Sequence, residues 1–428
     1  MCRRRNGNSR ITETKGRRTA GGIVLRKIAR TTLPDGTYAN LRDWVDFVRL
    51  PEEAREECRR DRQGLPDRDP GARAVIRAVT DWLGRAQDES RSSDGGFARD
   101  YSLLTGWNES YPETSGYIVP TLLAEADFQQ DERLVERARH CLDWLVAIQM
   151  DNGGFQGGTV SQKPRIAVTF NTGQILIGLA AGARYWNDAR YMNAMHAAAR
   201  FLRDSQDSDG AWRQHATPFA KEGDKTYETH VSWGLFEAER IAPGHGYAQA
   251  GLAQVGWALS RQSANGWFAD NDLQDSLRPL THTIGYALRG VIEAYRLSRD
   301  PVFLDSACRT ADALIRVTEL DGRIPGHLDS GWFAAAPYTC LTGTSQIAVC
   351  WFMLGRELGR DDYVDAARRA NAYVRRTISV EGAPDRRGGV KGSFPVSGVY
   401  GQYQYLNWAA KFTLDAQRME LLLAETAG

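Results

Sequence analysis

Cysteine is scarce in this chain, and its spacing excludes two kinds of site. The 428 residues include six cysteines, and none of them belongs to a Cys-x-x-Cys pair. Scattered cysteines of this kind argue against both a disulfide framework and a zinc ribbon. We therefore predict that the protein needs neither a metal ion nor a cofactor.

The chain also lacks a surplus of charge and any long apolar run. It carries 54 Lys and Arg against 53 Asp and Glu, a net charge of +1, so nothing in the balance demands nucleic acid or an anionic membrane. No run approaches the roughly eighteen consecutive apolar residues of a membrane span, and the N-terminus lacks the apolar core of a secretory signal. We predict a cytoplasmic protein with no transmembrane segment and no nucleic-acid partner.

Residues 1–70 differ in composition from the rest. They are rich in Arg, Asp and Glu, with Gly and Pro between them, and residues 1–20 are basic with few apolar anchors. Such a segment predicts disorder. A basic tail can make weak contact with a membrane surface or an acidic partner, but a solvated extension is the favoured interpretation.

From about residue 71 onward the chain repeats itself. Six segments share one plan, a helical stretch followed by a Gly turn and usually an aromatic residue, and the sixth is degenerate. They are 81–97, 143–155, 200–212, 257–268, 313–326 and 373–394. The first five recur roughly every 56–60 residues, which is long enough for one helical hairpin per repeat.

Each repeat has a physical reason for its consensus residues. A Gln lies near the end of the first helix, for example Gln149 and Gln206, and Asp/Asn-Gly then ends that helix because Gly accepts the left-handed conformation of a cap. The Gln side chain can donate a hydrogen bond to the turn backbone and tie one repeat to the next. We therefore assign the Gln, the Gly and the aromatic residue to stability rather than to chemistry.

A second helix follows each turn, and the residue pattern of these six helices predicts a ring-shaped fold. The six segments open with residues that cap a helix and then become apolar on most faces, with Gly, Ala and Ser among them. They are 110–123, 169–180, 226–236, 280–295, 340–354 and 403–416. Helices that are apolar nearly all round are buried, so these form an inner ring and the amphipathic helices an outer one. The predicted fold is all-α, an (α/α)6 toroid over residues 71–428.

These repeats resemble those of a known superfamily. The segment FLRDSQDSDGAW is similar to the QW repeats of squalene and hopene cyclases and of protein prenyltransferases, which are α/α toroids. The segments THTIGYALRG, CLTGTSQIA and GGVKGSFP resemble bacterial proteins with prenyltransferase/squalene-oxidase-type repeats, which tend to be encoded among polysaccharide-assembly enzymes. The resemblance implies the architecture more strongly than the chemistry.

The sequence lacks the motifs that several reactions of that superfamily require. There is no Asp-x-Asp-Asp motif to protonate an alkene, and the nearest string, Asp207-Ser-Asp209-Gly, lies in a predicted turn. No DDxxD cluster or GxSxG elbow occurs. Cys340 and His282 belong to neighbouring inner helices, but the closed ligand set that zinc requires is not evident.

The inner helices of a toroid deliver their first residues to one mouth, where their N-terminal dipoles favour an anionic ligand. Amide, hydroxyl, carboxylate and aromatic side chains gather there, as a carbohydrate requires. The predicted catalytic residues are Glu113 and Glu228 as acid and base, assisted by Tyr111, His230 and His282. The predicted substrate-binding residues are Asp100, Tyr101, Trp107, Asn171, Gln174, Tyr227, Trp332, Gln346, Lys391, Asn407 and Lys411.

Some of these residues have an equally simple structural interpretation. Asn171 can be only a helix cap, and Glu113 can stabilise its own helix N-terminus. Glu228 and His230 are two positions apart, so both face a pocket only if the helix begins near Thr229. Lys391 follows two glycines, and such a loop can hold an anion, but the P-loop spacing is absent.

Three function hypotheses follow. The first is a carbohydrate-active enzyme that hydrolyses, eliminates or epimerises a bacterial glycan or uronate polymer by acid/base chemistry. The second is a terpenoid cyclase or prenyl-transfer enzyme, which would need an apolar, aromatic cavity. The third is a non-catalytic binding or scaffold toroid, in which Glu113, Glu228 and His282 would point into packed helix contacts.

Overall fold

The computed structural model describes residues 47–426. The chain divides into a short unit, Met1–Arg55, and a large unit, Glu56–Gly428, and the description below concerns the large unit. This division falls earlier than the domain boundary predicted at residue 70, which stays a prediction. The expected disorder of residues 1–20 lies outside the described residues.

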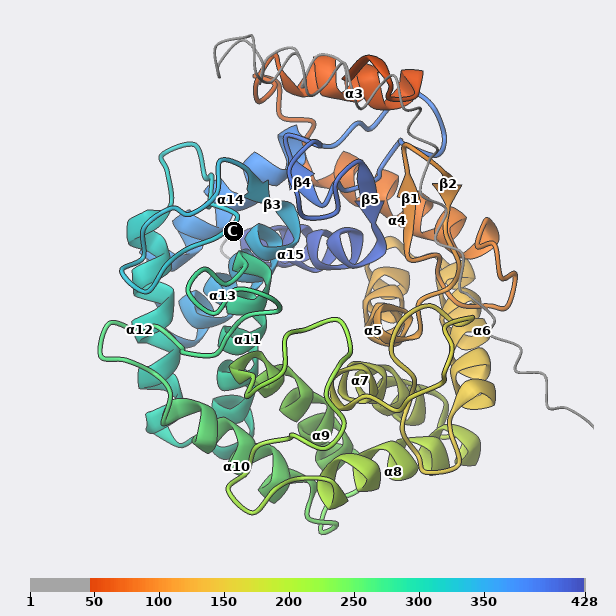
Figure 1. Cartoon of the computed structure of the whole chain (residues 1–428), viewed down its shortest axis with the longest axis vertical. Helices are drawn as coiled ribbons and strands as arrows, with labels where there is room; N and C mark the ends of the chain where they lie inside the picture. The colour runs from red at the N-terminus through yellow and green to blue at the C-terminus, as the bar shows by residue number, and fades with distance from the viewer. Residues whose placement is uncertain (1–46, 427–428) are drawn as a thin grey trace, which may run out of the picture. The chain divides into compact units, whose positions relative to one another are not determined.

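The large unit is a ring of paired helices, as Figure 1 shows. The inner helices are α5 (Pro112–Gln129), α7 (Thr169–Trp186), α9 (Thr229–Ile241), α11 (Thr281–Ser298), α13 (Leu341–Leu358) and α15 (Asn407–Thr426). The outer helices are α4 (Ala72–Asp88), α6 (Glu132–Ile148), α8 (Ala189–Asp204), α10 (Tyr247–Leu259), α12 (Pro301–Val317) and α14 (Asp361–Arg376). The predicted (α/α)6 toroid is thus confirmed. None of the described helices is long and apolar enough to cross a membrane.

Burial separates the two rings as the patterning predicts. In α7, 14 of 18 residues are buried, whereas in α8 only 7 of 16 are, because α8 presents one face to solvent. Small residues allow the inner helices to approach closely. A Cβ on Gly178 of α7 would lie 2.2 Å from the carbonyl oxygen of Gly116 in α5, so these helices pack backbone against backbone.

The repeated Gln residues join successive repeats. Gln149 Nε2 donates to the carbonyl of Gly153 in its own turn at 2.9 Å and to that of Ala194 in the next outer helix at 3.0 Å. Gln206 makes the same pair of bonds, to Gly210 and Ala250, both at 2.8 Å. The half-buried amide therefore satisfies carbonyls of two repeats at once, which is the role expected from the sequence.

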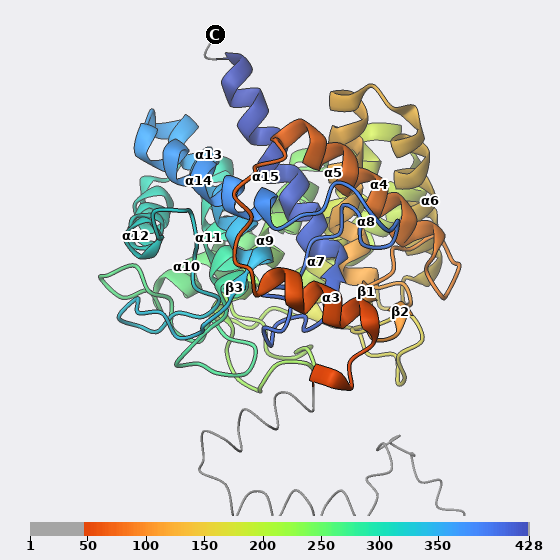
Figure 2. The same ribbon diagram turned by 90° about the horizontal axis from the view of Figure 1, so that it is seen from above.

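Short strands fasten the loops on one side of the ring, which Figure 2 shows from above. β1 (Asp100–Ser102) pairs antiparallel with β2 (Gly106–Trp107) and with β5 (Gln404–Leu406), so that Tyr101 lies opposite both Trp107 and Tyr405. β3 (Thr339–Cys340) pairs with β4 (Ser393–Phe394). The predicted helical start at residue 403 is therefore wrong, since residues 404–406 form a strand that joins the first repeat to the last.

Candidate functional site

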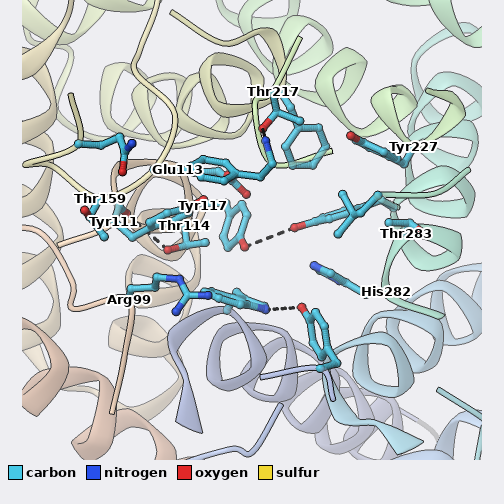
Figure 3. A pocket seen from close by; sticks show the side chains of 18 residues that line it. Arg99, Tyr111, Glu113, Thr114, Tyr117, Thr159, Thr217, Tyr227, His282 and Thr283 are labelled. Carbon is cyan, nitrogen blue, oxygen red and sulfur yellow. Dashed lines mark hydrogen bonds between the residues drawn. The ribbon is translucent and has the colours of Figure 1, made fainter. Parts of the chain in front are cut away.

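A pocket of about 400 Å³ opens where the inner helices begin, and we call it the central pocket. Its walls come from the first turns of α5, α7, α11 and α15, from the 3₁₀ turn η1 (Thr226–Glu228) and from the intervening loops. The lining residues, shown in Figure 3, are Arg99, Tyr111, Glu113, Thr114, Tyr117, Gly158, Thr159, Gln162, Phe170, Thr217, Phe219, Tyr227, Leu273, His282, Thr283, Tyr286, Tyr400 and Trp408.

Glu113 lies in the first turn of α5 and faces this pocket. Its Oε2 accepts a hydrogen bond from Nδ2 of Asn171 at 2.9 Å, and Tyr111 donates a second one. Burial raises the pKa of Glu113 to about 7, although the bond from Tyr111 and the charge of Arg99 lower it. Glu113 therefore exchanges its proton near neutral pH. Asn171 acts here as a partner of the carboxylate and not only as a residue at a helix start.

His282, the second residue of α11, also lines the pocket. Its Nδ1 lies 2.6 Å from Oε1 of Gln346. An amide oxygen can only accept, so Nδ1 carries the proton and Nε2 keeps a free lone pair. Burial lowers the pKa of His282 to about 4, against the opposing effect of the Gln346 bond. At neutral pH the imidazole is therefore an uncharged base.

A second His–Gln pair has the same geometry but does not line the pocket. His230 Nδ1 lies 2.6 Å from Oε1 of Gln174, and both residues are buried. Burial and the nearby cations Arg289 and Lys411 lower the pKa of His230 well below its ordinary value. The ring of Tyr286 contacts both imidazoles, with centroids 4.5 Å from His230 and 4.3 Å from His282. His230 thus supports the pocket floor.

Glu228 does not meet Glu113 in this cavity. Helix α9 begins at Thr229, as the prediction required, but η1 precedes it and Glu228 is absent from the lining of the central pocket. Burial raises the pKa of Glu228 to about 8, with Lys225 the largest opposing charge. Glu113 is consequently the one carboxylate among the described lining residues. Tyr227 does line the pocket, and its buried hydroxyl has no hydrogen-bond partner.

Three predicted binding residues belong to the small sheet beside the pocket. Asp100 is fully buried and pairs with Arg99 at 2.6 Å. Tyr101 and Trp107 pack edge to face at 5.2 Å, and the indole nitrogen of Trp107 donates to Asp385. None of the three lines the central pocket. They hold the loop that carries Arg99.

Four more predicted residues have partners elsewhere in the large unit and do not line the central pocket. Lys391 Nζ contacts Asp61 at 2.5 Å and Glu57 at 2.6 Å. Lys411 Nζ contacts Asp415 at 2.6 Å. The side chain of Asn407 donates to the carbonyl of Ala98 at 2.9 Å, and Trp332 packs against Trp267 at 5.2 Å. These contacts stabilise the fold around the site.

Sequence reasoning missed Arg99, Tyr400 and Trp408. The Arg99 guanidinium lies 5.4 Å from the Trp408 ring centroid and faces the pocket in Figure 3. Tyr400 accepts a hydrogen bond from the indole nitrogen of Trp408 at 2.7 Å. The one signal for Arg99 was its place beside Asp100 and Tyr101. Tyr400 lies in a loop whose path no periodic pattern specifies.

The described residues contain no cluster of three or more His, Cys, Asp or Glu side chains arranged to hold a metal ion. Cys340, the thiol considered for zinc, instead accepts a hydrogen bond from the backbone nitrogen of Gly343 at 3.4 Å and caps α13. Burial raises the pKa of the Cys340 thiol to about 12.

Comparison with solved structures shows that the ring shares its fold with known α/α toroids. An unsaturated glucuronyl hydrolase specific for heparin superposes with a TM-score of 0.67 at 14% identity, over 83% of this chain and 98% of that one. A sugar epimerase from a ruminal bacterium gives 0.64 at 12% identity, over 84% and 98%. A cellobiose 2-epimerase from Bacillus thermoamylovorans B4167 gives 0.61 at 11% identity, over 81% and 97%. Neither a family profile nor a curated protein sequence matches this chain.

Proposed function

We propose that this protein is a carbohydrate-active enzyme that transfers protons within the central pocket, with Glu113 and His282 as its acid and base. The observation that carries the proposal is that two titratable groups with opposed pKa shifts, Glu113 at about 7 and His282 at about 4, line one cavity. Figure 3 shows them on opposite sides of it. Groups whose environments separate their pKa values in this way are typical of acid/base sites.

The pair suits proton transfer at a carbon beside a carbonyl or carboxyl group. His282 Nε2 takes the proton from that carbon, and Glu113 in its acid form returns one to the carbon or to the leaving oxygen. The first outcome is epimerisation and the second is β-elimination. Hydrolysis by two carboxylates is less well supported, because Glu228 lies outside the pocket lining.

The remaining lining groups suit a sugar acid. Tyr, Trp and Phe rings offer flat faces for C–H surfaces, and Thr and Gln side chains offer hydrogen bonds to hydroxyls. Arg99 and the first turns of several inner helices favour a carboxylate and stabilise the charge that it gains during proton transfer. The sugar-acting proteins among the structural neighbours agree with a uronate-containing glycan as substrate. A role in polysaccharide assembly in the cytoplasm is part of this proposal.

One observation favours a second candidate, a terpenoid or prenyl-transfer enzyme of the cyclase superfamily. The pocket lining holds many aromatic side chains, which would also suit a prenyl chain. The Asp207–Asp209 turn does not supply the acid that such a cyclase needs. Asp207 and Asp209 are both paired with Arg213, and the bond from Arg213 lowers the pKa of Asp209 to about 2.

A thermal-shift screen with two ligand panels tests the proposal. One panel holds uronate-containing and neutral oligosaccharides, and the other holds polyprenyl diphosphates and squalene-like lipids. A ligand at a hundred times its dissociation constant should add about 2.7 kcal/mol of stability. We expect sugar acids to stabilise the protein, Glu113→Gln to abolish the effect, and the exposed control Glu132→Gln to preserve it. Stabilisation by the prenyl panel alone would overturn the proposal.

A further inference from the structure

A second hollow, of about 480 Å³, opens beside the central pocket, and we call it the rim hollow. Three loops line it, each leading into an inner helix. They contribute Asp275 and Arg278 before α11, the stretch from Ala335 to Tyr338 with His327 before α13, and Pro395 and Ser397–Val399 before α15. The rim hollow therefore lies on the face of the ring where the central pocket opens.

The two cavities share their dividing walls. Leu273 lines the central pocket while Asp275, two residues later, lines the rim hollow. Tyr400 likewise lines the central pocket, whereas its neighbour Val399 lines the rim hollow. His327 of the rim hollow forms a β-bridge with Leu280, two residues before His282. The same three segments therefore contribute residues to both cavities or lie between them.

The rim hollow combines an apolar platform with fixed polar groups. Pro337, Pro395 and the 74%-exposed Val399 form its apolar part. His327 is held on both sides, by the Tyr338 hydroxyl at 2.8 Å and by the carbonyl of Arg278 at 2.7 Å. These bonds occupy both ring nitrogens, so His327 is a fixed part of the wall, and the half-exposed Asp275–Arg278 pair supplies the polar groups. Polar groups beside an apolar surface that can pack on sugar C–H faces are what a saccharide unit requires.

We infer that the rim hollow is a distal subsite, which binds further sugar units of a glycan whose reacting unit occupies the central pocket. The inference rests on the proposed function and extends it, because the substrate becomes an oligosaccharide or polysaccharide rather than a single sugar. Two adjoining cavities of similar size leave room for units beyond the reacting one. Binding at the rim hollow adds affinity without touching Glu113 or His282.

The test is a calorimetric titration of the full chain with oligosaccharides of two, four and six sugars in which glucuronate alternates with an N-acetylhexosamine. Ser397→Trp fills the rim hollow from an exposed position, and Leu320→Trp adds the same side chain at a 97%-exposed site outside both cavities. We expect the dissociation constant to fall about tenfold from two sugars to six. Ser397→Trp should remove that gain and leave the disaccharide unchanged, while Leu320→Trp should retain it.

The outcomes separate the two proposals. Binding that does not strengthen with length, or a gain that survives in Ser397→Trp, overturns the distal subsite and leaves the proposed function standing. Failure of every oligosaccharide to bind, the disaccharide included, overturns the proposed function and the subsite with it. A gain with length that only Ser397→Trp removes supports both.

Discussion

At the scale of single residues, burial shifts two groups in opposite directions for one reason. Removal from water disfavours a charge, so the pKa of the Glu113 carboxyl rises to about 7 and that of the His282 imidazole falls to about 4. Between these values the acid keeps its proton while the base has none. The proposed reaction needs this combination of protonation states.

We expect a bell-shaped dependence of kcat/KM on pH for the free enzyme. Activity should rise as His282 loses its proton near pH 4 and fall as Glu113 loses its proton near pH 7. Initial rates across pH 3–9, with stability checked at each pH, measure both limbs. An activity that stays level up to pH 9 would remove Glu113 from the acid role.

The same carboxyl predicts a pH-dependent stability. The folded pKa of about 7 exceeds the model-compound value of 4.5, so the unfolded chain holds fewer protons between these values and stability falls as pH rises through that window. Glu113→Gln removes the effect. It should stabilise the protein at pH 8 by on the order of 2 kcal/mol and at pH 4 by little. Urea unfolding at the two pH values gives the difference, and an equal effect at both would contradict the raised pKa.

Gln346 positions His282, and its twin Gln174 provides a matched control. Gln346→Leu removes the acceptor for Nδ1–H, so we expect kcat to fall about tenfold. The acid limb of the pH profile should also move to lower pH, because this bond raises the pKa of His282. Gln174→Leu disturbs only the pair outside the pocket lining and should leave that limb in place. Equal shifts in both variants would show a general structural effect.

At the scale of elements, the Gly turns close the ring. Gly388 has φ +79°, and a Cβ there would lie 1.8 Å from the carbonyl oxygen of Ala78 in α4. Gly382 has φ +100° but nothing within 4 Å of the same position. Gly382→Ala should cost about 1 kcal/mol from backbone strain alone, and Gly388→Ala more than about 3 kcal/mol. Chemical unfolding measures both, and equal losses would contradict the close packing.

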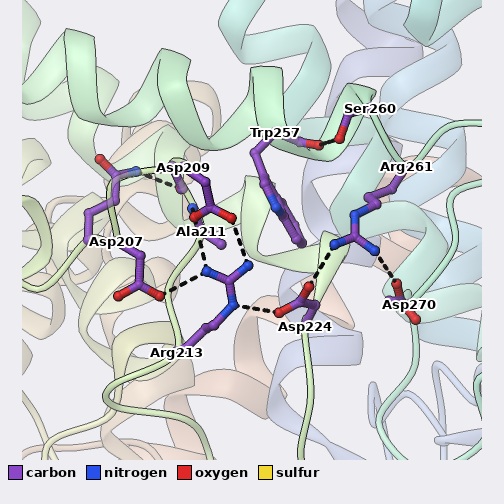
Figure 4. Close-up of polar contacts among 11 residues, drawn as sticks. Asp207, Asp209, Ala211, Arg213, Asp224, Trp257, Ser260, Arg261 and Asp270 are labelled. Carbon is purple, nitrogen blue, oxygen red and sulfur yellow. Dashed lines mark hydrogen bonds and ion pairs between the residues drawn. The ribbon is translucent and has the colours of Figure 1, made fainter.

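The turn between α8 and α9 has an ion network that belongs to the fold, as Figure 4 shows. Arg213 contacts Asp207 at 2.9 Å and both Asp209 and Asp224 at 2.8 Å, and its guanidinium lies 6.0 Å from the Trp257 ring. We expect Asp209→Asn to lower the melting temperature slightly in low salt and to leave kcat unchanged. A large loss of kcat would show that Asp209 takes part in catalysis and would favour the cyclase alternative.

The sequence predicts the elements better than it predicts the site. Repeats at a regular spacing predict where the helices lie, and the helix starts bring Tyr111, Glu113 and His282 to one mouth, although α5 and α11 begin without a side-chain cap. The direction of a side chain within the first turn depends on local details such as the 3₁₀ turn η1, which the sequence pattern did not predict. For this reason Glu228 and His230 do not line the pocket. Arg99 and Tyr400 reach it on irregular loops, where only tertiary contacts decide the path.

At the scale of the whole molecule, closure of the ring creates the site. Six inner helices begin on one face in the described chain, so residues far apart in sequence, such as Arg99 and Tyr400, wall a single pocket. The loops that lead into these helices also form the rim hollow. The ring thus gathers on one face the loops that line both cavities.

The most direct test of the account is hydrogen exchange into a substrate. The full chain is incubated in D₂O with the sugar acids that stabilise it, and deuterium at the carbon beside the carbonyl or carboxyl group is followed by NMR. We predict incorporation by the native protein, slowed at least about a hundredfold in both Glu113→Gln and His282→Gln. Epimerised product that lacks deuterium at that carbon, or incorporation that both variants retain, would contradict proton transfer by this pair, whereas β-elimination would be seen as loss of the hydrogen from that carbon.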